Sequence, residues 1–207
     1  MNRRNEDKVE LDIADQYGIT PFYRAVQCGY TEIVELLFEG GKVDPKKCCT
    51  GGYSPFYEAC YQGHFEIVKL LLINSDRVDL KKCNDTGASP LMAASAAGDV
   101  EAVAALITEG ADLNARESHN GQTPLMFAAW ENRPEVISFL MEQGAHSELT
   151  TSVLSLNEDR LDEYGNPRRR TKGSEQSGGN SAMGGMTALL FAARDGNCLL
   201  YTSDAAD

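Results

Sequence analysis

Thr20-Pro21-Phe22-Tyr23 is the first of four closely similar tetrapeptides in this chain. The others are Ser54-Pro55-Phe56-Tyr57, Ser89-Pro90-Leu91-Met92 and Thr123-Pro124-Leu125-Met126. Their prolines are 34, 35 and 34 residues apart, and a more distant copy, Thr187-Ala188-Leu189-Leu190, has Ala188 64 positions after Pro124. Self-similarity at a fixed period indicates an array of stacked small units rather than one globular core.

Each tetrapeptide has the chemistry that begins an α-helix. The Thr or Ser hydroxyl can accept a hydrogen bond from a free backbone N–H of the first turn. Proline at the first helical position loses nothing, because its missing N–H has no partner there. Glycine shortly upstream permits the positive φ of a tight turn. These upstream glycines are Gly18, Gly52, Gly87 and Gly121.

A second helix is predicted in every unit. The first helix is expected to end at a glycine or its equivalent, at Gly29, Gly63, Gly98 and Asn132. Glutamate then lies near the start of the second helix, where it complements the helix dipole. Apolar residues recur at helical spacing, and we expect Leu36, Leu70 and Leu106 to pack between neighbouring units.

Two further local expectations concern the ends of the second helices. Gly40, Gly110 and Gly144 should close these helices in a left-handed conformation. His64, which directly follows Gly63, is expected to cap its second helix.

Together these columns resemble the ankyrin repeat over residues 9–149 and 184–197. The resemblance implies an all-α fold, an α-solenoid of stacked helix-turn-helix units with β-hairpin or turn connections. One departure is the histidine that usually follows Thr-Pro-Leu in the family. Tyr23, Tyr57, Met92 and Met126 occupy that column, so a turn-stabilising hydrogen bond should be lost.

The repeat columns also predict how the chain is divided. Residues 1–14 are expected to form the tail of a preceding repeat or an N-terminal segment. Four repeats follow, at 15–48, 49–83, 84–117 and 118–149. An inserted loop rich in glycine, serine and charge is expected at 150–183, and the start of a truncated fifth repeat at 184–197.

Both ends of the chain break the pattern. The last ten residues, Cys198–Asp207, resemble the translation of a sequencing-library adapter. We interpret them as foreign to the natural protein, which we expect to continue past Asn197. At the other end, either translation starts within the tail of a repeat or the natural protein extends further upstream.

Composition excludes several classes of function. The formal net charge of −12 removes the usual electrostatic basis for binding nucleic acid. No apolar run approaches the roughly 20 residues that a membrane helix requires, and the N-terminus lacks the apolar stretch of a signal peptide. We therefore expect a cytoplasmic protein with reduced thiols.

The chemistry-bearing residues predict no metal, no cofactor and no catalysis. Cys60 lies in a small buried column, and Cys48, Cys49 and Cys83 fall near hairpins without Cys-x-x-Cys spacing or a histidine pair. The histidines have no matched nucleophile, and no glycine-rich phosphate loop is present. These histidines are His64, His119 and His146.

The favoured function is a non-catalytic, monomeric protein-interaction scaffold. The resemblance to ankyrin arrays implies that a protein partner binds on the concave face, which is formed by the hairpins and first helices. Mapped onto this sequence, the candidate protein-binding residues are Tyr17, Ile19, Gln27, Tyr53, Tyr61, Gln62, Asp85, Thr86, His119, Gln122, Trp130 and Glu131. The identity of the partner does not follow from the sequence.

Two alternatives remain open at this stage. The chain could be an enzyme, which would need a nucleophile, a base and an orienting group in one cleft. It could also recruit a substrate or partner for a larger enzyme or signalling protein whose other domains lie outside this sequence.

Overall fold

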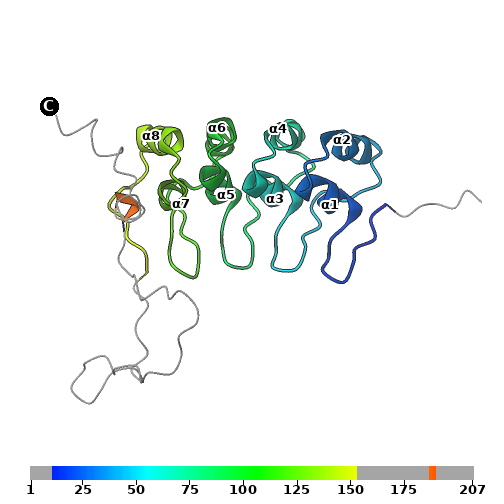
Figure 1. Ribbon diagram of the computed structural model, residues 1–207, viewed down its shortest axis with the longest axis horizontal. Helices are drawn as coiled ribbons and strands as arrows, with labels where there is room; N and C mark the ends of the chain where they lie inside the picture. The colour runs from blue at the N-terminus through cyan, green and yellow to red at the C-terminus, as the bar shows by residue number, and fades with distance from the viewer. Residues whose placement is uncertain (1–10, 153–186, 190–207) are drawn as a thin grey trace, which may run out of the picture.

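The computed structural model describes residues 11–152 and 187–189. Residues 11–152 form eight helices in four pairs (Figure 1). They are α1 (Pro21–Gln27), α2 (Thr31–Glu39), α3 (Pro55–Gln62), α4 (Phe65–Ile73), α5 (Pro90–Ala97), α6 (Val100–Thr108), α7 (Pro124–Trp130) and α8 (Pro134–Glu142).

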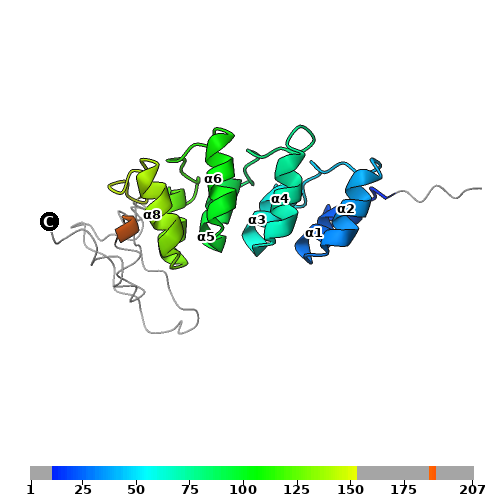
Figure 2. The ribbon, with the colours of Figure 1, turned by 90° about the horizontal axis from the view of Figure 1, so that it is seen from above.

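The helices stand in two rows. The first helices of the pairs, α1, α3, α5 and α7, lie side by side in one row, and α2, α4, α6 and α8 form the other (Figure 1). Seen from above, the helices of each pair are stacked one row over the other (Figure 2). Long loops project from the first-helix row, away from the second helices. The predicted all-α solenoid is therefore confirmed.

The described residues contain no β-strand, so the connecting loops are closed by turns rather than by a β-ladder. In the first loop Asp15 N donates to Ile19 O at 3.0 Å, and in the third Asn84 N donates to Ala88 O at 3.0 Å. The sequence predicted either β-hairpins or turns between the repeats. The described loops are turns, because only a few backbone hydrogen bonds close each of them.

The local signals for helix starts act as expected. The side chains of all four residues before the prolines accept a hydrogen bond from the backbone N–H three residues later, at 3.1–3.4 Å. These N-caps are Thr20, Ser54, Ser89 and Thr123.

One helix-end prediction was wrong by a residue. Gly40 is right-handed, with φ −59°, and the left-handed residue after α2 is Gly41, with φ 62°. Gly110 and Gly144 are left-handed as expected, with φ 77° and 89°. Two adjacent glycines satisfy the pattern equally well. The length of the last helical turn decides which of them reverses the chain.

The hydrophobic core runs between the two rows and from one pair to the next. Phe22, Phe56 and Leu106 are at most 1% exposed. The prediction for Leu36 was wrong, because its side chain is 72% exposed, and Leu70 is only half-buried. The column of Leu36 faces the preceding repeat, and in the described array no repeat stands in front of the first.

His64 links repeats rather than capping its helix. It is the N-cap residue of α4 but makes no side-chain capping bond. Its ring Nε2 instead lies 3.1 Å from Gln27 O at the end of α1. Arg133, in the same column two repeats later, donates from Nε to Ala96 O at 2.9 Å. This column therefore ties a repeat to the first helix of its predecessor.

The expectations for residues 1–10, for most of the inserted loop and for the last residues lie outside the described residues. Of the predicted fifth repeat, Thr187–Leu189 is described. Ala188 and Leu189 are helical, and Ala188 is 8% exposed and packs with the core.

Candidate protein-interaction surface

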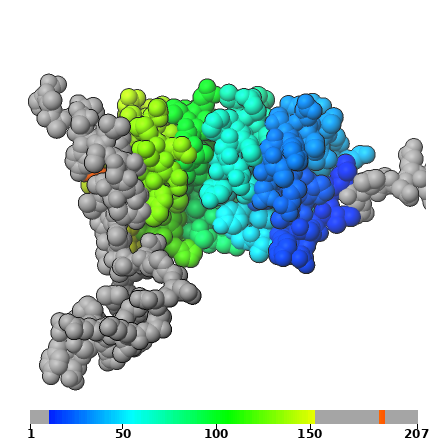
Figure 3. Space-filling model, in the orientation of Figure 1, coloured from blue at the N-terminus to red at the C-terminus, as the bar shows by residue number. Residues whose placement is uncertain are grey.

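The predicted site residues lie on the loop tips and on the C-terminal ends of the first helices, a surface we call the loop–helix face. On the viewed side the repeats form contiguous bands of surface (Figure 3). Hydrogen bonds join each tip to the next: Thr50 N to Tyr17 O at 2.8 Å, Asp85 N to Gly51 O at 2.9 Å, Ser118 N to Thr86 O at 2.7 Å and Ser152 N to Asn120 O at 2.5 Å. The spacing of the tips is therefore fixed before any partner arrives.

Three of the tips are also organised internally by a single polar side chain. Asp15 Oδ1 accepts from the N–H groups of Tyr17 and Ile19 at 2.8 and 2.9 Å. Asn84 Oδ1 does the same for Thr86 and Ala88 at 3.0 and 2.9 Å. These bonds fix the backbone of the tips, so the residue types at the other tip positions can differ between repeats without changing the loop conformation.

The fourth tip uses a longer side chain. Glu117, only 6% exposed, accepts from His119 N at 2.6 Å, Asn120 N at 2.7 Å and Gln122 N at 3.0 Å. It lies seven residues before its proline, whereas Asp15 and Asn84 lie six before theirs. The longer glutamate compensates for the extra residue in this loop.

Aromatic side chains form a ladder along α3. Tyr53 and Tyr57 meet edge to face with centroids 5.3 Å apart, and Tyr57 and Tyr61 stack at 6.3 Å. Tyr57 is buried and Tyr53 half-buried, but Tyr61 is 59% exposed. A large, rigid aromatic surface is thus held ready beside the loops, which is typical of interface anchors.

A buried carboxylate lies next to this ladder. Glu58 is 7% exposed and accepts from Tyr23 Oη at 2.9 Å, Gln27 Nε2 at 3.2 Å and Gln62 Nε2 at 2.9 Å. The Tyr23 hydroxyl thus makes an inter-repeat bond in the column where the family histidine is replaced. Gln27 and Gln62, both predicted to bind a partner, are engaged within the molecule.

The other predicted residues divide by exposure. Tyr17, Gln62, Asp85, His119 and Glu131 are exposed, and Trp130 is 37% exposed. Ile19, Gln27, Tyr53, Thr86 and Gln122 are half-buried. The half-buried residues hold the loops and helices in place: the Thr86 hydroxyl, for example, donates to Asn84 Oδ1 at 2.7 Å. Within the exposed set, Gln62 already donates to Glu58, and the other members present their side chains at the surface.

Sequence reasoning missed Tyr57 and Glu58. The four-residue spacing of Tyr53, Tyr57 and Tyr61 was visible and predicts neighbours on one face. Glu58 is an acid in a column that holds Ala93 and Phe127 in the two following repeats and Arg24 in the preceding one. A buried acid at this position signals a specific polar contact.

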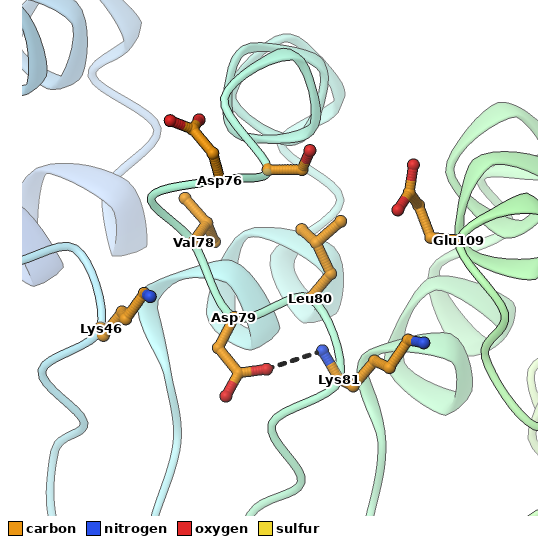
Figure 4. Close-up of a pocket in the computed structure, with 8 residues that line it drawn as sticks. Lys46, Asp76, Val78, Asp79, Leu80, Lys81 and Glu109 are labelled. Carbon is orange, nitrogen blue, oxygen red and sulfur yellow. Dashed lines mark hydrogen bonds between the residues drawn. The ribbon is translucent and has the colours of Figure 1, made fainter.

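A shallow, polar hollow is the next feature that could support chemistry. It measures about 470 Å³ and lies among the loops that follow the second helices (Figure 4). Lys46 and Lys81 face three carboxylates across it, those of Asp76, Asp79 and Glu109, and Lys81 N donates to Asp79 Oδ1 at 3.1 Å. Its lining holds Ser75 but no histidine or cysteine, so it lacks the nucleophile–base pair that acyl or phosphoryl chemistry uses.

The titratable residues of the described ranges do not assemble elsewhere. Within residues 11–152 and 187–189, no group of three or more His, Cys, Asp or Glu side chains is placed to hold a metal ion. His119 lies on the fourth loop and His146 follows α8, and both are exposed.

Burial of several thiols and phenols predicts a loss of stability in alkali, and Cys60 and Tyr23 are two of them. Burial raises the pKa of the Cys60 thiol above 9.0. Burial, with contributions from Cys49 and Glu58, raises the pKa of the Tyr23 phenol above 10.0. The unfolded chain therefore releases these protons first, so the stabilisation is complete below about pH 8.5 and is lost as the pH rises.

We expect the free energy of unfolding to fall above about pH 8.5, by at most about 1.4 kcal/mol per pH unit for each group. Urea titrations under reducing conditions measure this slope. Cys60→Ala should reduce the part that begins near pH 8.5, to which Cys48 and Cys83 also contribute. Tyr23→Phe should reduce the part that begins near pH 10, to which Tyr57 also contributes. A slope of undiminished, wild-type steepness in both variants would contradict this assignment.

A family model described as ankyrin repeats, in three copies, matches residues 5–82 and 73–151. The two matches together span well over half of the chain. The chain belongs to the ankyrin repeat family. Ankyrin repeats are in general protein–protein interaction modules and are typically non-catalytic. Comparison with curated proteins found no match. No helix in the described ranges has the length and apolarity to cross a bilayer.

Proposed function

We propose that this ankyrin array is a non-catalytic scaffold that binds a protein partner on its loop–helix face, which would be the concave side. The observation that carries the proposal is the exposed Tyr61, stacked on the buried Tyr57 at 6.3 Å. Tyrosine held in this way offers a large contact area with little conformational entropy left to lose. Trp130 adds a second exposed aromatic at the end of α7.

The neighbouring polar side chains support recognition of a protein surface. Asp85, His119 and Glu131 are exposed around the aromatics and offer charged or hydrogen-bonding groups. Aromatic anchors within a polar rim are the usual composition of a protein–protein interface. The net charge of −12 makes nucleic acid an unsuitable partner. A cytoplasmic setting is part of the same proposal.

Photo-crosslinking tests which face binds. A photoreactive amino acid is placed at Tyr61, and in a control protein at Ile73, which is 84% exposed on the second-helix row. We expect the Tyr61 position to trap a discrete partner from the host's own extract and the Ile73 position to trap none.

The trapped partner, once purified, allows a quantitative test. Tyr61→Ala and Trp130→Ala should each weaken its affinity by about 30-fold, equivalent to about 2 kcal/mol. Ile73→Ala should leave both affinity and helicity unchanged. If both aromatic variants bound as tightly as the wild type, the interface would lie elsewhere.

The alternative, recruitment of a substrate for a larger enzyme or signalling protein, would use the same face. It predicts that the complete open reading frame encodes a catalytic or signalling domain and that the captured protein is modified by it.

A further inference from the structure

The ring of Tyr61 has one covered face and one open face. It stacks on Tyr57 with an interplanar angle of 15° and a centroid separation of 6.3 Å. Four helical residues rise by about 6 Å, so the stack follows the axis of α3 and the free face of Tyr61 is directed towards the end of this helix. Because the side chain is 59% exposed, a planar group of a partner can stack on that face.

The amide of Gln62, the last residue of α3, is oriented by Glu58. A carboxylate only accepts hydrogen bonds, so the nitrogen of the amide, and not its oxygen, must face Glu58 Oε1, at 2.9 Å. In the part of the chain that the structure describes, no group donates to the Gln62 oxygen, and the side chain is exposed. Gln62 therefore presents an oriented acceptor at the end of α3.

Glu58 also places a negative charge beside the tyrosines without a paired cation. Its three hydrogen-bond donors are one phenol and two amides, which are neutral groups. None of the ion pairs within residues 11–152 includes this carboxylate. Burial is the main cause that raises the pKa of the Tyr57 phenol, and the charge of Glu58 raises it further. The electric field of the carboxylate therefore reaches the aromatic ladder.

Two further features make the same end of α3 electronegative. The carbonyl groups at the C-terminus of a helix carry the negative end of its dipole, and α3 has no basic residue in its last turn. The face of a tyrosine ring is also negative, which attracts a cation placed over it. The open face of Tyr61, the Gln62 oxygen and the helix end thus favour the same kind of group, a positively charged hydrogen-bond donor.

The basic side chains of the neighbouring elements are bonded elsewhere. Arg24 donates from Nη1 to Gln27 Oε1 at 2.6 Å, and His64 Nε2 lies 3.1 Å from Gln27 O. On the other side of α3, Arg133 donates from Nε to Ala96 O at 2.9 Å. Each of the three is thus bonded to an oxygen of α1 or α5, and the acceptor at the end of α3 stays available to a partner.

We propose that the end of α3 binds an arginine side chain of the partner protein. The guanidinium stacks on the open face of Tyr61 and donates to Gln62 Oε1, while Glu58 acts as a positioning residue that orients this amide and supplies negative charge. Arginine fits better than lysine, because its planar guanidinium stacks on aromatic faces and presents several N–H donors in one plane. This assignment rests on the proposed function and specifies one group of the partner.

A small probe tests the arginine site without the partner. N-acetyl-arginine amide is titrated into the full chain, and the NMR signals of the Gln62 side-chain amide and the Tyr61 ring are followed. We expect saturable shifts with a Kd of about 10 mM. N-acetyl-citrulline amide, which has a similar shape but no charge, should bind about tenfold more weakly or not at all.

Two variants of the chain serve as a matched pair for the same titration. Glu58→Gln removes the buried charge and should weaken the binding of the arginine probe by about threefold or more. Glu131→Gln changes an exposed acid in the column of Gln62, on α7, and should leave the Kd unchanged. Circular dichroism verifies that both variants are folded.

The partner trapped at Tyr61 provides the second test. Each arginine of its crosslinked segment is replaced by lysine in turn, and one replacement should weaken the affinity by about tenfold. Gln62→Ala should cost little more in that variant, because the two changes remove the same hydrogen bond.

The outcomes separate this site from the proposed function. If Tyr61→Ala weakened binding but no arginine replacement did, the arginine site would be overturned and the scaffold function would stand. If Tyr61→Ala bound the partner as tightly as the wild type, both would be overturned. An arginine probe that shifts neither Gln62 nor Tyr61, or a citrulline probe that binds equally well, would also overturn the arginine site.

Discussion

Ile67→Ala should lower the free energy of unfolding by about 2–5 kcal/mol, whereas Ile73→Ala should change it by less than about 0.5 kcal/mol. Both isoleucines belong to α4, but Ile67 is 0% exposed and Ile73 84% exposed. The first substitution leaves a cavity between the second helices of neighbouring repeats, and the second removes atoms that already face water.

Urea denaturation followed by circular dichroism measures both variants at one dilute concentration. The matched pair removes differences in helix propensity, since the same change is made twice in one helix. Equal losses at the two positions would mean that α4 does not use its Ile67 side to pack against the preceding repeat.

Glu117→Ala is the substitution with the second largest expected effect, a loss of about 2–4 kcal/mol. The carboxylate is 6% exposed and accepts three backbone N–H groups of the fourth loop. Alanine leaves these donors without a partner. Hydrogen bonds to a charged acceptor contribute more than neutral ones.

Two controls separate the loss of the loop's hydrogen bonds from the loss of a negative charge. Glu117→Gln keeps an acceptor oxygen and should cost clearly less than alanine, while Glu131→Ala, at an exposed position, should cost almost nothing. Hydrogen exchange at residues 118–122 should accelerate in Glu117→Ala alone. Unchanged exchange there would show that the loop is held by other contacts.

The features predicted well from the sequence are those set by local chemistry. Thr20 caps α1 because a hydroxyl precedes a proline and a helix. Asn132, with φ 53°, replaces the glycine of the other repeats because asparagine tolerates the left-handed region. A repeated column supplies several independent copies of such a signal, and the repeat fold follows from them.

The features predicted poorly depend on neighbours far away in the chain. Leu36 and Leu70 occupy the same column, so no sequence pattern distinguishes them. Among the described residues, however, only Leu70 has a preceding repeat beside it. Gln27 was placed on the binding face by its column. In the structure it donates to Glu58, 31 residues away. A column describes the average repeat, whereas these residues respond to the particular repeat on each side.

The binding surface depends on exposed side chains that differ from one repeat to the next. Tyr61 and Trp130 are exposed, and their role in binding stays a prediction. The loop tips and the Tyr53–Tyr57–Tyr61 ladder are already ordered, so a partner would bind them without the entropy cost of ordering the backbone.

The central claim is that each helical pair is stabilised by the repeats on either side of it, and native-state hydrogen exchange tests it most directly. The account predicts strongest protection in α3–α6, which have a repeat on both sides, and clearly weaker protection in α1 and α2. Protection that is equal from α1 through α6 would contradict it.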